Sequence, residues 1–142
     1  MFKKTFKISN SHSVANKDKK KIREQLIKQQ FDAPSVDAFL NDKKFEGGSE
    51  LLLDKLQGSK VQLLSRNKTP LMFSVDSKHG TVYLPTIYLL FLLEELPPLR
   101  IYLKEGVEQY IFNGADLMWP GIKSLSKDDF KTFDVVVIYA KN

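Results

Sequence analysis

The ten residues from Asn113 to Ile122, with the sequence NGADLMWPGI, constrain the fold more than any other part of the chain. Asn113-Gly114 predicts the end of a helix, because glycine readily adopts the left-handed conformation that ends helices. Leu117 and Met118 then predict the beginning of a short strand. Pro120-Gly121 predicts a turn that breaks this strand.

The residues before it extend this unit. Val107 and Ile111 are four residues apart and share a face, which predicts a helix over residues 105–112. A short strand is expected before it, over residues 100–103. The order strand, helix, glycine cap, strand, turn predicts a small unit that contains both helix and sheet.

The composition excludes several classes of function. The chain of 142 residues is 42% hydrophobic and has no cysteine, so it can bury a core and suits a reducing compartment. Its two histidines, His12 and His79, stand in polar, turn-like surroundings. Asp128-Asp129 is interpreted as a solvated turn, so no catalytic set, metal cluster or cofactor site is expected, and we expect a protein that is not an enzyme. The apolar run over residues 82–93 is shorter than the roughly 20 residues that span a bilayer, so no membrane partner is expected.

Positive charge is concentrated at one end of the chain. The net charge is +5, yet residues 1–31 hold nine Lys/Arg and two Asp/Glu, a local charge of +7. Such an asymmetry favours a polyanionic partner, with nucleic acid first. A solvated lysine-rich face is an equally good interpretation of the charge alone.

The basic residues gather on and before a predicted helix. Ile22, Leu26 and Ile27 predict a helix that is capped by Asn16 or Asp18 and runs to about Gln30. Its lysines crowd the N-terminal turn, where the helix dipole disfavours cations, which favours an anion-binding role over mere solubility. The candidate RNA-binding residues of this segment are Lys3, Lys4, Lys7, Lys17, Lys19, Lys20, Lys21 and Arg23.

The remaining elements follow from local signals. A strand over residues 2–8 is expected, followed by a polar loop over residues 9–16. The other expected elements are a helix from Pro34-Ser35 with Val36, Phe39 and Leu40 inward, an ambiguous segment 51–56, strands 60–65 and 71–75 around a longer hairpin loop 66–70, and a helix from Pro85 to about Glu94. Pro97-Pro98 then predicts a domain boundary.

The motif Gly114-Ala115-Asp116-Leu117-Met118-Trp119-Pro120-Gly121 resembles the opening of a PUA domain, an RNA-binding pseudo-barrel. Residues 134–138 resemble the next strand of that family. Together with the Met-Phe-Lys-Lys start, the basic helix, the hairpin and Pro85-Thr86, it resembles the ligatin (translation initiation factor 2D) family, to which the MCT oncoprotein is related. The resemblance implies an α+β fold. A pre-PUA α/β domain with a mixed or antiparallel sheet would occupy residues 1–97, and the incomplete N-terminal part of a PUA-like β pseudo-barrel would occupy residues 98–142.

The family implies a cytoplasmic factor that binds the small ribosomal subunit and its ribosomal RNA, and that places or releases tRNA in the P site without GTP. Further C-terminal domains of a longer protein are an expectation of the same resemblance. It adds a second group of candidate RNA-binding residues: Gly114, Ala115, Asp116, Pro120, Gly121 and Lys123.

Two alternatives stay open. The chain could be the RNA-targeting module of an RNA-modification protein, since PUA domains occur there too. It could also be a protein-interaction adaptor that docks partners through Tyr88, Phe91, Tyr110 and Trp119, although helical spacing favours interior positions for most of these aromatics.

Overall fold

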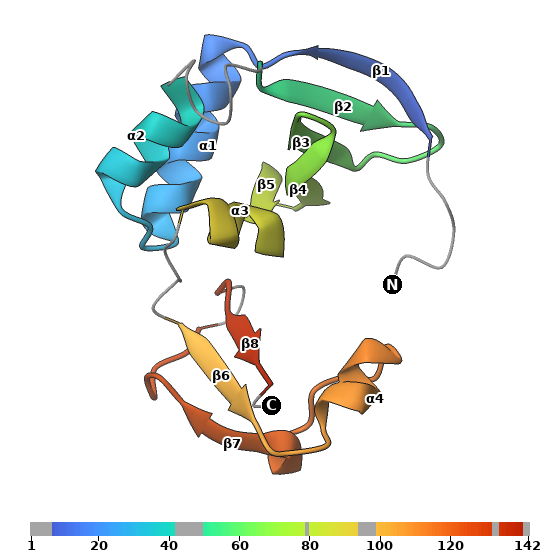
Figure 1. Ribbon diagram of the computed structural model, residues 1–142. Helices are drawn as coiled ribbons and strands as arrows, with labels where there is room; N and C mark the ends of the chain where they lie inside the picture. The colour runs from blue at the N-terminus through green and yellow to red at the C-terminus, as the bar shows by residue number, and fades with distance from the viewer. Residues whose placement is uncertain (1–6, 42–49, 79, 94–98, 132–133, 141–142) are drawn as a thin grey trace. The chain divides into compact units, whose positions relative to one another are not determined.

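The computed structural model describes residues 7–41, 50–78, 80–93, 99–131 and 134–140. The chain divides into two compact units, residues 2–95 and residues 96–142. The predicted boundary at Pro97-Pro98 and the helix end at Glu94 lie outside the described residues. The α+β class is confirmed, because each unit combines helix and sheet (Figure 1).

The first unit is built on a five-stranded sheet that is antiparallel throughout. Its strands are β1 (Ile8–Ser13), β2 (Leu52–Leu56), β3 (Gln62–Arg66), β4 (Thr69–Ser77) and β5 (Gly80–Pro85), in the order β1-β2-β3-β4-β5. Two helices, α1 (Asn16–Lys28) and α2 (Ala33–Asn41), lie between β1 and β2 in the chain, and α3 (Ile87–Leu93) follows β5. The ambiguous segment 51–56 is therefore a strand.

The core of this unit lies between the helices and the sheet. α1 contacts α2 and β5, while α3 contacts β4, β5 and α2. The predicted inward residues of α2 are buried, as are Ile22 and Leu26 of α1, whereas Ile27 is half-buried. The apolar side chains with the least exposure are Ile22, Leu26, Val36, Phe39, Leu64, Leu71, Met72 and Leu89.

Two helix starts differ from the predictions. α1 begins after Ala15 with no side-chain cap, so neither Asn16 nor Asp18 caps it. Pro85 ends β5 rather than beginning α3. The next residue, Thr86, donates its hydroxyl to the carbonyls of Pro70 and Leu71 at 2.8 and 3.0 Å, and this fastens the start of α3 to β4.

The predicted strand over residues 2–8 can be compared only at its end, where Ile8 is in a strand, whereas the prediction of a loop over residues 9–16 was wrong. Residues 8–13 form β1, whereas residues 9–16 were expected to be a loop, and residues 2–6 lie outside the described residues. Every residue of β1 is exposed, and all but Ile8 are polar. The sequence therefore lacks the alternation of apolar and polar residues that would have predicted a strand. Backbone pairing with β2 holds this edge strand, together with a hydrogen bond from Ser11 to the buried carboxylate of Asp54.

The hairpin between β3 and β4 is tighter than predicted. Arg66 pairs with Thr69, which leaves a two-residue turn instead of a loop over residues 66–70. Asn67 and Lys68 both have positive φ, 49° and 64°, as a type I′ turn requires. This turn type matches the twist of the flanking strands.

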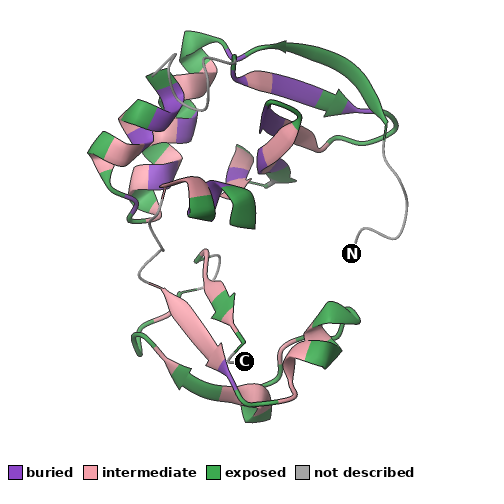
Figure 2. Cartoon of the chain, viewed as in Figure 1, coloured by how far each residue is buried: buried purple, intermediate pink, exposed green. Residues whose placement is uncertain are grey.

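The second unit is a small mixed sheet with one short helix. β6 (Arg100–Leu103) lies between β7 (Ile122–Leu125), which is antiparallel to it, and β8 (Val137–Tyr139), which is parallel to it (Figure 1). The helix α4 (Glu108–Phe112) and a 3₁₀ turn, η2 (Trp119–Gly121), connect β6 to β7. Leu103 is the only buried residue among the described residues of this unit, as the burial colouring shows (Figure 2).

The predicted elements of this unit are partly confirmed. The strand over residues 100–103 is present, and the helix begins three residues later than predicted. Leu117 and Met118 are not in a strand, because the chain enters η2 and pairs with β6 only from Ile122. The predicted strand over residues 134–138 is β8, which begins at Val137.

Candidate nucleic-acid interface

The exposed face of α1 presents a row of lysines. Lys17, Lys20 and Lys21 are exposed and lie on the side of the helix opposite Ile22 and Leu26, which are buried. None of the three makes an ion pair with a described residue. Lys28, one turn beyond Glu24, continues the same face, so the row extends roughly 16 Å at 1.5 Å per residue.

Two of the predicted RNA-binding residues of α1 are placed differently. Lys19 is half-buried. Arg23 forms a two-pronged ion pair with Asp37 of α2, at 2.6 Å from Nε and 2.9 Å from Nη2. The hydrogen bond from Arg23 holds the pKa of the Asp37 carboxyl below its ordinary value, and the same bond raises the pKa of Arg23. Arg23 therefore joins α1 to α2, and its guanidinium is already engaged.

Side chains of α1 fix the orientation of the lysine row. The amide of Gln25 donates to the carbonyl of Thr81 at 2.9 Å and accepts the backbone N–H of Tyr83 at 2.7 Å. Gln29 donates to the Tyr83 carbonyl at 3.2 Å. The ammonium of Lys21 lies 5.9 Å from the centre of the Tyr83 ring, whose phenol pKa is raised by burial. These contacts hold one side of α1 against β5, with Lys21 at the border of that side, and leave Lys17 and Lys20 outward.

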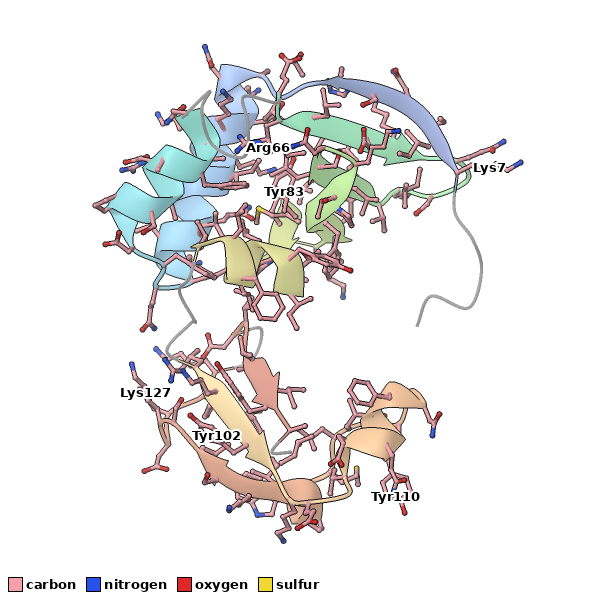
Figure 3. All side chains as sticks on the ribbon, in the orientation of Figure 1. Lys7, Arg66, Tyr83, Tyr102, Tyr110 and Lys127 are labelled. Atoms are coloured by element: carbon pink, nitrogen blue, oxygen red, sulfur yellow. The ribbon has the colours of Figure 1, made fainter. Side chains whose placement is uncertain are left out.

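The basic residues before β1 are only partly described. Lys7 is exposed beside the start of β1, and its carbonyl accepts the backbone N–H of Gln57 at 2.8 Å (Figure 3). Lys3 and Lys4 lie outside the described residues. Lys7 therefore belongs to the sheet edge rather than to the lysine row of α1.

The glycine cap of α4 has the predicted conformation. Gly114 has φ +89°. Its N–H donates to the carbonyl of Ile111 at 2.9 Å, and the N–H of Ala115 donates to the carbonyl of Tyr110 at 2.9 Å. This pair of bonds is a Schellman motif. Gly114, Ala115 and Asp116 are all exposed, so backbone and carboxylate are accessible at this corner.

The remaining predicted residues of the second unit have separate roles. Pro120 is exposed in η2, and Lys123 is exposed on β7. Gly121 is half-buried, and a Cβ atom placed there would stand 3.0 Å from Cγ1 of Val107. Gly121 thus permits close packing against Val107. The described candidate residues therefore lie on different elements: α1 and the start of β1 in the first unit, and the cap of α4, η2 and β7 in the second.

The prediction that most of the four aromatic residues point inward was wrong. Tyr88, Phe91, Tyr110 and Trp119 are between 55% and 73% exposed. Helical spacing shows which residues share a face, but it does not show whether that face is covered. Ile87, Phe112 and Met118 are exposed in the same two regions.

Two half-buried tyrosines of the second unit, which were not predicted as site residues, lie side by side. Tyr102 of β6 and Tyr139 of β8 stack with their ring centres 5.3 Å apart. Their proximity depends on the parallel pairing of β6 with β8, which joins segments far apart in the chain. No local signal in the sequence reports such a pairing.

Other kinds of site find no support in the described ranges. No group of three or more His, Asp or Glu side chains that could hold a metal ion occurs there. His12 is exposed on β1, and His79 lies outside the described residues. None of the described helices is long and apolar enough to cross a bilayer.

The fold and the surface define a class, an α+β protein of two units. The first unit is an antiparallel sheet covered by helices, one of which is basic. The second is a small mixed sheet with a glycine-capped helix. The chain belongs to the pre-PUA-like domain family, whose model matches residues 2–93. No curated protein matches the sequence.

Solved structures extend the likeness to the second unit. A conserved PUA domain protein from Thermoplasma acidophilum is similar, with a TM-score of 0.64 and 24% identity over 92% of this chain and 72% of that protein. A PUA domain from Aeropyrum pernix K1, solved as a tartrate complex, has a TM-score of 0.62 and 17% identity, over 92% of this chain and 65% of its own length. The second unit thus has a PUA-like fold.

Proposed function

We propose that this chain is an RNA-binding module of a translation factor that binds the small ribosomal subunit and helps place or release tRNA in the P site. The observation that carries the proposal is the row of outward lysines on α1, at Lys17, Lys20 and Lys21, which make no ion pair with a described residue. Lysines of this kind neutralise phosphates without reading sequence. PUA-like domains are generally RNA-binding, which agrees with this charge.

The two units supply different kinds of contact. The lysine row supplies charge over roughly 16 Å, enough to meet several phosphates along one strand. The corner at Gly114 and Ala115 has no bulky side chain, so an RNA backbone can approach it closely. The factor would act in the cytoplasm by binding and positioning, without catalysis or a cofactor.

Sedimentation with purified ribosomal subunits tests this function. The protein is centrifuged with small subunits, with large subunits and with deproteinised ribosomal RNA of equal mass. We expect retention on small subunits, with weaker and less selective retention on free RNA. Equal retention on both subunits, or none on either, would overturn the assignment to a small-subunit factor.

A role in docking partner proteins is the second candidate, because Tyr88, Phe91, Tyr110 and Trp119 are exposed. Salt dependence separates the two functions. RNA binding weakens steeply as salt rises, whereas apolar docking does not. Retention on the small subunit that persists at high salt would favour docking onto a ribosomal protein.

A further inference from the structure

One face of the second sheet is hollowed by a pocket of about 280 Å³. The register places Tyr102 opposite Ser124 on β7 and opposite Tyr139 on β8, so the three side chains form a row across the sheet. The alternate residues Ile101, Leu125 and Ile138 share the other face. The residues that line the pocket are Tyr102, Leu103, Lys123, Ser124, Tyr139 and Ala140.

The tyrosines give this pocket a stiff aromatic wall. Their rings are 5.3 Å apart with planes inclined by 29°, so each restrains the other. Stacked aromatic side chains bind the flat faces of planar ligands, and a base stacked on such a side chain is a common element of single-strand recognition. The wall therefore favours a planar ligand.

The polar groups of the pocket further restrict the chemical class of the ligand. The hydroxyl of Tyr139 is buried and has no hydrogen-bond partner among the described residues. Burying such a group is costly unless a partner satisfies it. Ser124 adds a hydroxyl, Lys123 adds a cation, and no carboxylate of a described residue lines the pocket. A planar ligand with hydrogen-bonding edges and a nearby negative charge would satisfy the two hydroxyls and the lysine.

We propose that this pocket binds a single unpaired nucleotide. The base stacks against the tyrosine wall, its edge meets the hydroxyls of Tyr139 and Ser124, and its phosphate lies at Lys123. The volume lies just below the roughly 300–1,000 Å³ that ligand pockets span, which fits one base and its sugar rather than a dinucleotide. The proposal concerns a different surface from the lysine row and does not depend on the ribosomal role.

Fluorine NMR of protein labelled with 3-fluorotyrosine tests the pocket directly. The five tyrosine signals are assigned with single Tyr→Phe variants, and the protein is titrated with the four nucleoside monophosphates and with ribose 5-phosphate. We expect the Tyr102 and Tyr139 signals to move with at least one nucleotide and to stay in place with ribose 5-phosphate. Equal shifts with the sugar phosphate, or no shift at millimolar nucleotide, would overturn the proposal.

Two variants separate binding from folding. Tyr102→Leu removes half of the wall and should weaken nucleotide binding by about 5- to 150-fold, the range for one stacked base. Tyr139→Phe keeps the ring and removes the buried hydroxyl, so it should weaken binding while leaving the melting temperature unchanged or higher. Tyr110→Phe is the matched control, since Tyr110 lies on α4 outside the pocket (Figure 3).

The outcomes also separate this pocket from the proposed function. A loss of nucleotide binding in Tyr139→Phe with undiminished small-subunit binding supports an independent pocket. Unchanged nucleotide binding in both pocket variants overturns the pocket and leaves the lysine row untouched. Shifts produced by a tryptophan-containing peptide, and by no nucleotide, would identify a protein-docking pocket and also overturn the proposal.

Discussion

The side-chain oxygen of Gln25 accepts the backbone N–H of Tyr83 at 2.7 Å, so a helix residue occupies the hydrogen-bonding position of a neighbouring strand. The same amide donates to the carbonyl of Thr81, and thus pairs with β5 at two points. β5 is an edge strand of the five-stranded sheet. Open edges invite pairing with other chains, and a covering helix prevents it. The contact also fixes which face of α1 points outward.

Gln25→Ala should destabilise the first unit. It leaves the Tyr83 N–H without its acceptor in a buried position, which costs about 1–3 kcal/mol. Urea unfolding and amide exchange at Tyr83 measure this effect. Glu24→Ala, one residue away and exposed, is the control and should stay within about 0.5 kcal/mol of the parent. Equal effects of the two changes would show that the edge contact contributes nothing.

The ion pair between Arg23 and Asp37 predicts a dependence on pH. The pKa of Asp37 is lowered from 3.8 by the hydrogen bond from Arg23. A lowered carboxyl pKa contributes stability that is present above 3.8 and is lost as the pH falls through the folded-state pKa. The melting temperatures of the parent and of Asp37→Asn should therefore differ near neutral pH and converge in acid. A constant difference down to the most acidic sample would contradict this. Asp129→Asn serves as the control, because Asp129 is exposed and lies outside the pair.

Gln30→Gly should stabilise the protein. Gln30 follows α1 with φ +69°, and the bonds from Gln30 to Ile27 and from Phe31 to Leu26 form a Schellman motif. A left-handed conformation costs an L-residue roughly 1–2 kcal/mol, and the added chain entropy of glycine offsets part of the relief. The net gain is about 0.5–1 kcal/mol, measured by thermal unfolding. Lys28→Gly, inside the last helical turn, should be destabilising, and a Gln30→Gly variant that also melts lower would contradict this account.

The conformation of the α4 cap predicts that the loss of stability on replacing Gly114 depends on how well the new residue tolerates positive φ. No atom lies within 4 Å of a Cβ placed there, so any cost arises from the backbone at φ +89°. Gly114→Val should destabilise the second unit by about 1 kcal/mol or more, whereas Gly114→Asn should cost less, because asparagine tolerates positive φ. Unfolding followed by Trp119, the one tryptophan of the chain, reports on this unit. Equal losses of stability in both variants would exclude the backbone mechanism.

Local signals in the sequence were sufficient to predict several elements of the fold. The Asn113-Gly114 stop, the strand over residues 100–103 and the inward residues of α2 each depend on neighbours in the chain, and all three are confirmed. Gln30 makes the same left-handed cap as Gly114 without any sequence signal, because glutamine has no preference for it. The position was therefore missed.

Features that depend on distant parts of the chain could not be predicted. β1 is held by pairing with β2, about forty residues away, and its exposed side chains carry no pattern. Arg23 was predicted to bind RNA with the other cations of the basic helix, because the sequence does not show that α2 brings Asp37 beside it. The tyrosine wall requires the pairing of β6 with β8, and the exposure of Tyr88 and Trp119 depends on what covers their elements.

The salt dependence of RNA binding tests the central claim most directly. Affinity for small subunits is measured across a series of salt concentrations for the parent, for Lys17→Gln/Lys20→Gln/Lys21→Gln, and for a charge-matched control, Lys55→Gln/Lys60→Gln/Lys78→Gln, whose lysines are exposed outside α1. If the row on α1 binds phosphates, the slope of log K against log salt falls by about 0.7–0.9 for each phosphate that the α1 variant no longer neutralises, and stays at the parent value in the control. An α1 variant with the parent slope, or an equal fall in both variants, would contradict the account and leave these lysines as a solvated face.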